Sequence, residues 1–584
     1  MNPSKEQQIF IDAEGKIVLC ACPGSGKTFA IAHKIVKHIK NWEEPHKGIA
    51  TLTFTNVAKD EIIQQVTNIS DFSQRASYPH FIGTIDSFLN QFIFTRFAYL
   101  LTDQHKKPFL THENVESTFR WNNTCHKKGC PSKINNFRWS LDGSTYENNK
   151  IVSCNEPRRC DEYKKMLYKK GVFFQNDVPY MCYKLLREHP TIANAIVERF
   201  PIILIDEAQD TSKEQMAIFD LLEKNGLKTI GIVGDPDQSI YEWRNANTSE
   251  FMAKISHENW QTLYFKENRR SSQMICNATA KFSDLCKDCG ANSAVGEDKN
   301  FTQKPELMLI DAKADKEVTK EDAIKYFLQR CKALNITETY NNVAVLTRSR
   351  IHQNTDITGL WKSNEIKLLA QATYEWKYGS KKNAYNLCWD CLFLLLIDEL
   401  HSVDQDIECT INTKISIDIW KDLCLGIVCS LPDADLTLCN WLKEIKNLFK
   451  DIDLPLPIRA GHTFSDVLKI KTKDKKNPTF QSISLKEYFE KKQKNNITIS
   501  SIHGVKGETY EAVMLFAPSL TGTTITQKLI SNGDLKNEHN RAAYVAMTRP
   551  KKYLAVAIAK PKDMNILNTR FPTTLWNYVE LNKQ

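Results

Sequence analysis

The stretch ACPGSGKT, residues 21–28, lies between an apolar run and an amphipathic pattern, and this order restricts the fold more than any other feature. The run KIVLCA predicts a strand, and FAIAHKIVKHIK after the stretch predicts a helix. A glycine-rich turn between a strand and a helix binds phosphate, because backbone N–H groups and the helix dipole favour an anion there. Ala21 replaces the usual first glycine, but the rest of the motif is intact. The sequence therefore predicts an α/β fold with a nucleotide site at this turn.

Five residues of the turn have predicted roles in holding ATP and Mg²⁺. Gly24 and Gly26 let the backbone approach a phosphate closely, and Ser25 lies between them at the tip. Lys27 is expected to reach the β- and γ-phosphates, and the Thr28 hydroxyl is expected to ligate Mg²⁺. The loop does not reveal which reaction the nucleotide drives.

Length and composition indicate a water-soluble protein of several domains. The chain has 584 residues, which is too long for one hydrophobic core. Apolar residues make up 42% and charged residues 25%, and no apolar run is long enough to cross a bilayer. The start, MNPSKEQQIF, lacks a secretion signal, so we expect a cytoplasmic protein. The net charge of +9 permits nucleic-acid binding without demonstrating it.

Four of the 17 cysteines cluster in the segments CHKKGC and CNEPRRC. In a reducing compartment they are not expected to form disulfides. Two such pairs could hold structural Zn²⁺ tetrahedrally, although their spacing is looser than in the commonest zinc ribbons. The alternative is a set of unrelated free thiols. The four candidate zinc ligands are Cys125, Cys130, Cys154 and Cys160.

Two further apolar runs end in residues suited to phosphate chemistry. FPIILIDEAQDTS, residues 200–212, predicts a buried parallel strand with two acids at its carboxyl end. We expect Asp206 to hold Mg²⁺ and Glu207 to orient and deprotonate the attacking water. KTIGIVGDPDQSIYEWRNA, residues 228–246, predicts another such strand, with Gln238 just past its end to sense the γ-phosphate.

The order of these motifs resembles that of the UvrD/Rep/PcrA group of superfamily 1 DNA helicases, nearly from end to end. The resemblance implies two RecA-like cores, each a parallel sheet flanked by helices, and ATP hydrolysis coupled to 3′-to-5′ movement on single-stranded DNA. It implies that Gln7 reads the adenine, and that Arg270 and Arg549 of the second core contact the γ-phosphate. The other segments that carry it are TLTFTNVAKDEI, GTIDSF, ENRRSS, VAVLTRSR, TISSIHGVKGETYEAVML and EHNRAAYVAMTRP.

The resemblance also implies DNA contacts from both cores, and aromatic side chains beside a phosphate sensor are suited to stacking on bases. In two places the chain departs from the family pattern. Asp86 stands where the family usually has His, so no role is carried over to it. Thr509 stands at the usual ribose-binding glutamate, so that contact falls to Glu508 or is lost. The implied DNA-binding residues are Phe54, Thr55, Asn56, Thr84, Tyr241, Trp243, Arg244 and His503.

Each core is expected to be split by an insertion. The predicted bounds are 1–88 and 180–265 for the first core, 89–179 for its cysteine-containing insertion, 266–355 and 495–584 for the second core, and 356–494 for its helical insertion.

Two functions remain open from the sequence. The first is a DNA helicase or translocase that acts on single-stranded DNA, or on a duplex with a single-stranded end, in repair or antiphage defence. Compact relatives with a VKGET-type segment occur beside OLD-type nucleases in Gabija-type antiphage systems. The alternative is therefore an ATPase that senses nucleotides and DNA ends and regulates a partner nuclease without processive unwinding. We find no nuclease motif in the chain, so any cutting activity is expected of a partner.

Overall fold

The structure is a computed structural model, and its described residues form two compact units. One unit spans Met1–Phe109, Arg120–Ile351 and Ile497–Gln584, and the other spans Leu110–Phe119 and His352–Asn496. The first unit contains two large parallel sheets, which we call the first core and the second core. The structure describes residues 2–40, 42–69, 78–111, 137–143, 145–147, 164–240, 248–290, 292–310, 320–348, 360–397, 411, 414–458, 463, 467–471, 482–493, 497–517 and 533–581.

The sheet of the first core has six strands in the order β10-β1-β9-β8-β2-β3, and all neighbouring strands are parallel. The inner strands are almost entirely buried, as expected for apolar runs in a parallel sheet. The carboxyl ends of the strands lie at one edge, so the segments after β1, β8 and β9 meet there. The strands are β1 Lys16–Ala21, β2 Ile49–Thr53, β3 Phe81–Thr84, β8 Ile202–Ile205, β9 Thr229–Gly234 and β10 Gln261–Phe265.

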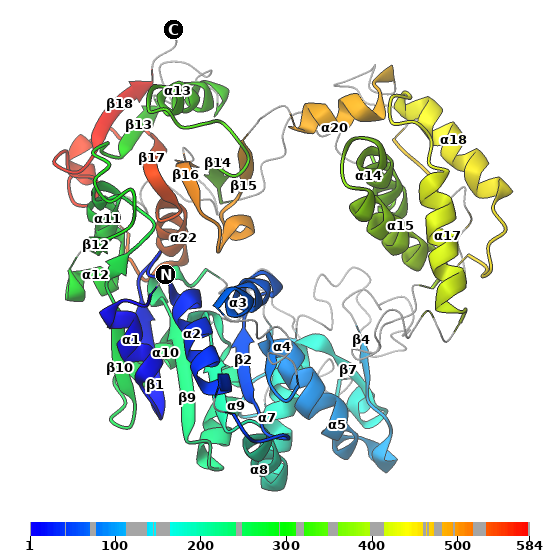
Figure 1. The fold of residues 1–584 in the computed structure, drawn as a ribbon, viewed down its shortest axis with the longest axis horizontal. Helices are drawn as coiled ribbons and strands as arrows, with labels where there is room; N and C mark the ends of the chain where they lie inside the picture. The colour runs from blue at the N-terminus through cyan, green and yellow to red at the C-terminus, as the bar shows by residue number, and fades with distance from the viewer. Residues whose placement is uncertain are drawn as a thin grey trace. The chain divides into compact units, whose positions relative to one another are not determined.

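Helices lie beside the strands of this sheet (Figure 1). Their buried apolar side chains share one hydrophobic cluster with those of the strands. In α2, Ile31, Ile35 and Ile39 recur at a spacing of four and are buried. The same helix buries Lys34, whose Nζ donates to the carbonyl oxygens of Phe10 at 3.1 Å and Ala13 at 2.5 Å. The larger helices of this core are α1 Lys5–Asp12, α2 Lys27–Lys40, α3 Asn56–Ile69, α7 Val178–Glu188, α8 Pro190–Arg199, α9 Lys213–Lys224 and α10 Thr248–Ile255.

The sheet of the second core also has six parallel strands, in the order β15-β14-β16-β17-β13-β18. Successive side chains of β16 alternate between its faces: Val513 and Leu515 lie in one hydrophobic cluster, and Ala512 and Met514 in the other. Both faces are therefore buried. The elements are β13 Glu306–Ile310, β14 Val343–Thr347, β15 Thr498–Ser501, β16 Tyr510–Phe516, β17 Pro550–Ala559, β18 Asn577–Leu581, α11 Gln273–Thr279, α12 Asp284–Cys289, α13 Lys320–Ala333 and α22 Glu538–Met547.

The second unit is helical in its described part and has its own hydrophobic core. Trp420 and Trp441 are fully buried there, and Nε1 of Trp441 donates to Oγ1 of Thr373 at 3.1 Å. The predicted α/β fold with two parallel-sheet cores is confirmed, whereas the exact domain bounds stay a prediction. The helices of this unit are α14 Asn364–Tyr378, α15 Lys381–Leu396, α17 Ile417–Cys429, α18 Leu438–Asp451 and α20 Leu485–Gln493.

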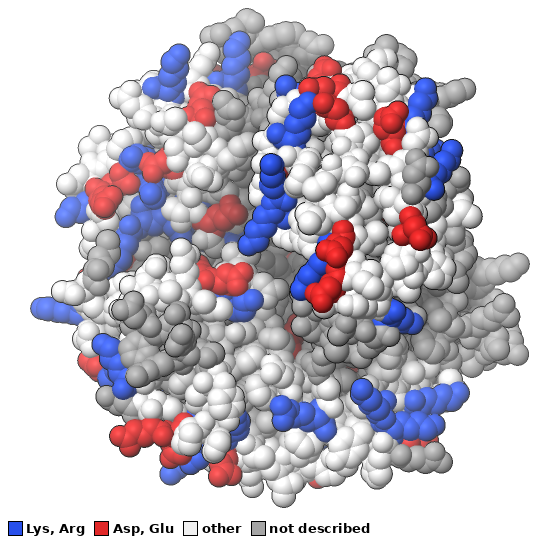
Figure 2. All heavy atoms as spheres, turned by 45° about the vertical axis from the view of Figure 1, so that its right-hand side comes forward, with Lys and Arg blue, Asp and Glu red and all other residues white. Residues whose placement is uncertain are grey.

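Two surface properties bear on function. Among the helices that the structure describes, none is both long and apolar enough to span a membrane. On the face drawn in Figure 2, the described Lys and Arg side chains are interspersed with Asp and Glu and do not gather in one basic band. On this face the net positive charge of the chain does not by itself mark a nucleic-acid surface.

Candidate functional site

The turn after β1 is fixed by its backbone angles and by two neighbouring segments. Gly24 and Gly26 have φ angles of 71° and 79°, in the left-handed region that favours glycine. A Cβ on Gly24 would lie 2.6 Å from Cβ of Arg270, and a Cβ on Gly26 would lie 2.7 Å from Nε2 of Gln7. Close packing and conformation therefore both require glycine at position 24, and conformation favours it at position 26.

The amide of Gln7 is bound by the protein on both sides. Its Nε2 donates to the carbonyl oxygen of Ser25 at 3.0 Å, and its Oε1 accepts from the backbone N–H of Ser4 at 3.0 Å. Ser4 and Gln7 together cap the N-terminus of α1. The structure thus places Gln7 as a support of the phosphate loop, and its predicted contact with adenine stays a prediction.

Asp206 and Glu207 follow β8, and their pKa values shift in opposite directions. Burial, together with the charge of Glu207, raises the pKa of Asp206 to about 7. Burial also opposes ionisation of Glu207, but Lys27 and Lys506 outweigh it and lower the pKa of Glu207 to about 2. Nζ of Lys27 lies 3.6 Å from Oε1 of Glu207. Glu207 is therefore ionised at neutral pH, whereas Asp206 needs a cation beside it to stay charged.

The backbone at Glu207 is strained, with a φ angle of 53° and a ψ angle of 37°. Left-handed conformations are rare for residues other than glycine, and they cluster at functional sites. Its Oε2 accepts from Nε2 of Gln209 at 2.5 Å, which fixes the carboxylate. This geometry suits a group that must orient a water molecule.

Gln238 joins the two cores through its side chain. It lies in a short 3-10 helix, Pro236–Gln238, directly after β9. Its Nε2 donates to Oδ2 of Asp235 at 2.6 Å, and its Oε1 accepts from Nη2 of Arg549 at 2.5 Å. The predicted sensor is therefore placed between an acid of the first core and an arginine of the second core.

Arg549 is buried and Arg270 is partly buried, and the two lie close to each other. Nη1 of Arg270 donates to the carbonyl oxygen of Thr548 at 3.0 Å, and Nε of Arg549 donates to that of Val545 at 2.9 Å. Burial, together with the charge of Arg549, lowers the pKa of Arg270 to about 9. Burial also lowers the pKa of Arg549. Two neighbouring cations with little access to water are stabilised by an anion, so the pair fits a phosphate.

Lys506 and Asp210 complete the site, and the sequence analysis assigned neither of them to it. Lys506 of the second core forms an ion pair with Oδ2 of Asp210, and its Nζ lies 3.9 Å from Oε2 of Glu207. Burial raises the pKa of Asp210 to about 6, although Lys506 acts against the shift. Asp210 is the last acid of DEAQD, and Lys506 lies in TISSIHGVKGETYEAVML, one of the segments that carry the family resemblance. The sequence signal that could have indicated Asp210 is that this acid follows Glu207 by one helical turn.

Two predicted DNA-binding side chains make contacts between the cores. Phe54 packs against the hydrophobic cluster of the second core. Nε2 of His503 donates to the carbonyl oxygen of Ile240 at 2.9 Å, and burial lowers the pKa of His503, which favours the neutral ring. Both residues therefore belong to the boundary between the cores, and their DNA contacts stay predictions.

Other predicted DNA-binding residues lie at helix starts. Oγ1 of Thr55 accepts from the backbone N–H of Ala58 at 3.2 Å, and Asn56 is the first residue of α3. Oγ1 of Thr84 accepts from the backbone N–H of Ser87 at 3.1 Å. These hydroxyls cap helices that follow β2 and β3, at the same sheet edge as the nucleotide site.

Asp86, which departs from the family pattern, and Glu508, the possible substitute for the ribose-binding glutamate, each have a partner in the structure. Asp86 is exposed, and its Oδ1 accepts from Nε2 of Gln215 at 2.9 Å. Glu508 accepts from the hydroxyl of Tyr510. The predicted ribose contact of Glu508 stays a prediction.

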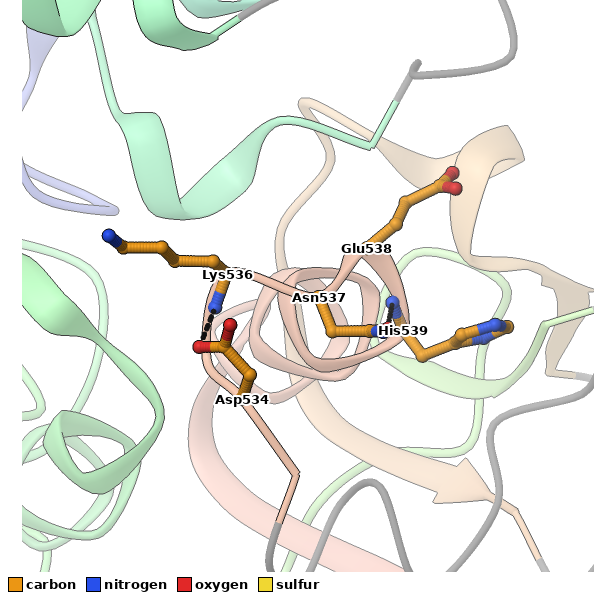
Figure 3. A pocket seen from close by; sticks show the side chains of 5 residues that line it. All are labelled: Asp534, Lys536, Asn537, Glu538 and His539. Carbon is orange, nitrogen blue, oxygen red and sulfur yellow. Dashed lines mark hydrogen bonds between the residues drawn. The ribbon is translucent and has the colours of Figure 1, made fainter.

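A polar hollow of about 400 Å³ lies at the N-terminus of α22, apart from the phosphate loop (Figure 3). Oδ1 of Asn537 accepts from the backbone N–H of His539 at 2.9 Å, so Asn537 caps the helix. Oε1 of Glu538 lies 3.2 Å from Nη2 of Arg348. The hollow is lined by Asp534, Lys536, Asn537, Glu538 and His539.

Several predicted residues lie outside the described part of the chain. They are Tyr241, Trp243 and Arg244, and the four candidate zinc ligands Cys125, Cys130, Cys154 and Cys160. Within the described part, no cluster of three or more His, Cys, Asp or Glu side chains is suited to holding a metal ion. The zinc prediction is therefore untested.

The residues present fit ATP and Mg²⁺. Among the described atoms, Oγ of Ser25 is buried in the loop without a hydrogen-bond partner, as expected of a group that faces a phosphate. Burial raises the pKa of Glu61, and the Thr28 hydroxyl acts against this shift. Burial and the charges of Glu207 and Glu61 raise the pKa of Asp206. Hydroxyl and carboxylate oxygens in small number suit Mg²⁺, which keeps most of its other ligands as water and phosphate.

Lys27 keeps its charge in this site. Burial alone would lower the pKa of Lys27, but the charges of Glu207, Asp235 and Asp206 raise it above its ordinary value. The ammonium group is therefore available to a phosphate at neutral pH.

Comparison with known proteins gives two family matches. The UvrD/REP helicase N-terminal domain matches residues 1–259, and the UvrD-like helicase C-terminal domain matches residues 412–561. The ATP-dependent DNA helicase Rep of Buchnera aphidicola subsp. Acyrthosiphon pisum is 24% identical and is covered over 94% of its length by 95% of this chain. The Gabija protein GajB of Bacillus cereus VD045 is 24% identical, with 96% of this chain covering 97% of that protein. The ATP-dependent DNA helicase PcrA of Staphylococcus epidermidis RP62A is 25% identical over 62% of this chain, which spans 50% of that protein.

Proposed function

Because the chain belongs to the UvrD/Rep helicase family, an enzyme class of ATP-dependent DNA helicases, we propose that it hydrolyses ATP to move along single-stranded DNA. The observation that carries this proposal is the meeting of opposite charges from two cores at one sheet edge. The first core supplies the phosphate loop and the acids Asp206 and Glu207, and the second core supplies Arg270 and Arg549.

In this proposal each residue has a separate task in hydrolysis. The phosphate loop and Lys27 hold the β- and γ-phosphates, and Asp206 and Thr28 hold Mg²⁺. Mg²⁺, when bound, neutralises charge on the phosphate oxygens. Glu207 orients water for attack on the γ-phosphoryl group and accepts its proton. Arg270 and Arg549 stabilise negative charge on the transferred group, and such donors act strongly in a site that excludes water.

Hydrolysis is coupled to movement because the site is complete only when both cores hold the nucleotide. A ligand can shift a conformational equilibrium only through contacts that differ between the two states. The contacts of Arg270 and Arg549 with the γ-phosphate form only in the closed state, so binding closes the cleft and hydrolysis releases it. The expected direction is 3′ to 5′, and the expected partner is single-stranded DNA or a duplex with a single-stranded end.

Strand displacement tests this proposal directly. A labelled duplex with a 3′ single-stranded tail is incubated with the purified chain and ATP, beside the same duplex with a 5′ tail and a blunt duplex. We expect displacement of the 3′-tailed duplex and little of the other two, with Lys27→Ala as the blank. Displacement of the 5′-tailed duplex alone would show that the chain moves 5′ to 3′. ATP hydrolysis without any strand displacement would contradict helicase activity.

A second candidate function is favoured by the match with the Gabija protein GajB, which extends over nearly the full length of both chains. Here the chain would sense nucleotides and DNA ends and regulate a partner nuclease of the OLD type in antiphage defence. The same catalytic residues would act, but without processive unwinding. Challenge of cells with phage, comparing the wild-type chain with Glu207→Gln, tests this role. Equal protection by the wild-type chain and by Glu207→Gln would show that ATP hydrolysis is not needed for this role.

A further inference from the structure

The first helix of the chain, α1, packs against α2, the helix that begins at Lys27 of the phosphate loop (Figure 1). Near the start of α1, the amide of Gln7 donates to the carbonyl oxygen of Ser25 in the loop, as described above. The left-handed conformation of Gly26 leaves the space that this amide fills. The position of α1 therefore affects the conformation of the loop.

The first turn of α1 also contacts the segment that precedes Arg270. Oε2 of Glu6 accepts from the backbone N–H groups of Lys266 at 2.8 Å and Glu267 at 3.3 Å. A little further along this segment, the backbone N–H of Arg269 donates to the carbonyl oxygen of Gly24 at 2.8 Å. The start of α1 thus supports both the phosphate loop and the segment that packs against it.

The other end of α1 is bound by a lysine of α2. Carbonyl groups at the C-terminal end of a helix have no partners within the helix. Nζ of Lys34 donates to the carbonyl oxygen of Phe10 at 3.1 Å and to that of Ile11 at 3.4 Å. It also donates to the carbonyl oxygen of Ala13 at 2.5 Å. A cation at this end is further favoured by the helix dipole.

Burial shows that these bonds are the main purpose of Lys34. The residue is 0% exposed, and burial lowers its pKa to about 8, so the ammonium form predominates at pH 7. A buried charge is costly unless hydrogen bonds compensate it. The carbonyl oxygens that accept from Lys34 all belong to the end of α1 and to its C-cap, Ala13. The contacts of Lys34 therefore fix the position of α1.

We propose that Lys34 is a positioning residue of the nucleotide site: it holds the end of α1, and α1 in turn holds Gln7 against Ser25 and the phosphate loop in its binding conformation. This inference rests on the nucleotide binding in the proposed function. Because the loop binds phosphates, removal of Lys34 weakens every triphosphate ligand, whether or not the ligand carries a base.

Calorimetry with inorganic tripolyphosphate and Mg²⁺, beside a non-hydrolysable ATP analogue, tests this inference. We expect Lys34→Met to raise the Kd of both ligands five- to twentyfold. The kcat at saturating ATP should stay within threefold, because the loop binds the ground state and the transition state alike. Unchanged affinity for tripolyphosphate would overturn the inference, including the case in which only the ATP analogue binds more weakly.

Two other lysines supply the controls. Lys40→Met removes the same charge from an exposed position at the end of α2 and should change neither Kd. Lys164 is also 0% exposed, and its Nζ lies 2.8 Å from Oδ1 of Asp177. Lys164→Met leaves that buried carboxylate unpaired, so it should lower the Tm and keep the affinity for tripolyphosphate. An equal loss of affinity in Lys164→Met would attribute the effect to general destabilisation and would overturn the inference.

A double-mutant cycle tests the route through α1. Gln7→Ala should itself weaken tripolyphosphate binding, and Lys34→Met should then add less than a twofold further loss, because residues that act through one another are not additive. A full further loss in the double variant would overturn the inference. Should Lys34→Met fail to fold, Lys34→Gln, which keeps a hydrogen-bond donor, carries the same comparisons with smaller losses.

Hydrogen exchange without nucleotide separates this inference from the proposed function. In Lys34→Met we expect faster amide exchange in peptides that cover residues 5–13 and 22–28, and unchanged protection in β9. Unchanged exchange in the loop peptide would overturn the inference even if the wild-type chain hydrolyses ATP. A wild-type chain that binds neither ATP nor tripolyphosphate would refute the proposed function, and the exchange of the loop peptide would still decide whether Lys34 holds the loop.

Discussion

The two cores share a sheet architecture but contribute opposite chemistry to the site. In the first core, the functional groups are a backbone loop and acids directly after β1, β8 and β9. In the second core they are cations, and those that reach the first core bind carbonyl and carboxylate oxygens there. In the proposed function, the first core alone holds the nucleotide, and both cores are needed to balance the charge of phosphoryl transfer. The difference predicts that binding and hydrolysis can be separated by mutation.

The largest expected effect is in the first core. Glu207→Gln removes the base but keeps the shape of the side chain, so ATP hydrolysis should fall by about 10²–10⁴-fold. Nucleotide affinity should change little, because Lys27 and the phosphate loop remain. Glu188→Gln, at an exposed position at the end of α7, is the control and should be unaffected. Substantial residual hydrolysis in Glu207→Gln would show that another group accepts the proton.

The second prediction concerns the second core. Arg549→Gln should lower kcat by about 10²–10³-fold, as expected for loss of one donor to the transferred group. The Kd for ATP, measured with a fluorescent non-hydrolysable analogue, should change less than it does in Lys27→Ala. Arg570→Gln, which removes a buried arginine of the same core, should keep its kcat. If Arg549→Gln lost ATP binding as severely as Lys27→Ala, this would contradict the proposal that the first core binds the nucleotide and the second core acts in hydrolysis.

The third prediction uses pH to test the ion pair between the cores. The raised pKa of Asp210, about 6, means that the folded state binds more protons than the unfolded state between about pH 4 and 6. Stability from this group is therefore present below pH 4 and is lost as the pH rises through 6. Because the pKa differs by about two units between the folded and unfolded states, the free energy of unfolding falls by about 3 kcal/mol over this pH range. Thermal unfolding of the wild type and Asp210→Asn at pH 4.5 and 6.5 should show a difference that grows with pH. A constant difference would mean that the carboxylate is ionised throughout.

The smallest expected effect is at Asp86. An exposed carboxylate in a segment that is predicted to contact DNA would repel phosphates, so Asp86→Asn should tighten binding of oligo(dT) at low salt. An exposed charge interaction is worth about 0.2–1 kcal/mol, which corresponds to a change of at most about fivefold. The effect should vanish at high salt. Asp103→Asn, at another exposed position, is the control, and equal gains in both would reflect net charge alone.

The sequence predicts the first core better than the second. The phosphate loop and the acids at 206 and 207 follow from local patterns, because a buried strand that ends in a turn or in acids places them at the sheet edge. The adenine contact of Gln7 is implied by the resemblance and stays a prediction, whereas the bonds of its amide to Ser4 and Ser25 had no signal in the local pattern. Local patterns predict a helix or strand and where it ends, but they do not predict which neighbouring group forms hydrogen bonds with a given side chain.

The contacts between the cores could not be predicted in this way. Lys506 and Asp210 are 296 positions apart, and Arg541 and Ser239 are 302 apart. Their meeting depends on the packing of two separately formed sheets, for which no periodicity in the sequence is a signal. The resemblance supplied Arg270 and Arg549 because their motifs are specific, but it gave no role to Arg541.

The most direct test of the whole account is the rate of ATP hydrolysis by the purified chain, without DNA and with saturating single-stranded DNA, with Lys27→Ala as the blank. The account predicts stimulation of at least tenfold by the single strand, because DNA binding and closure of the cores on the nucleotide are coupled. Fast hydrolysis that DNA leaves unchanged or suppresses would contradict it and would favour a nucleotide-gated subunit of a nuclease.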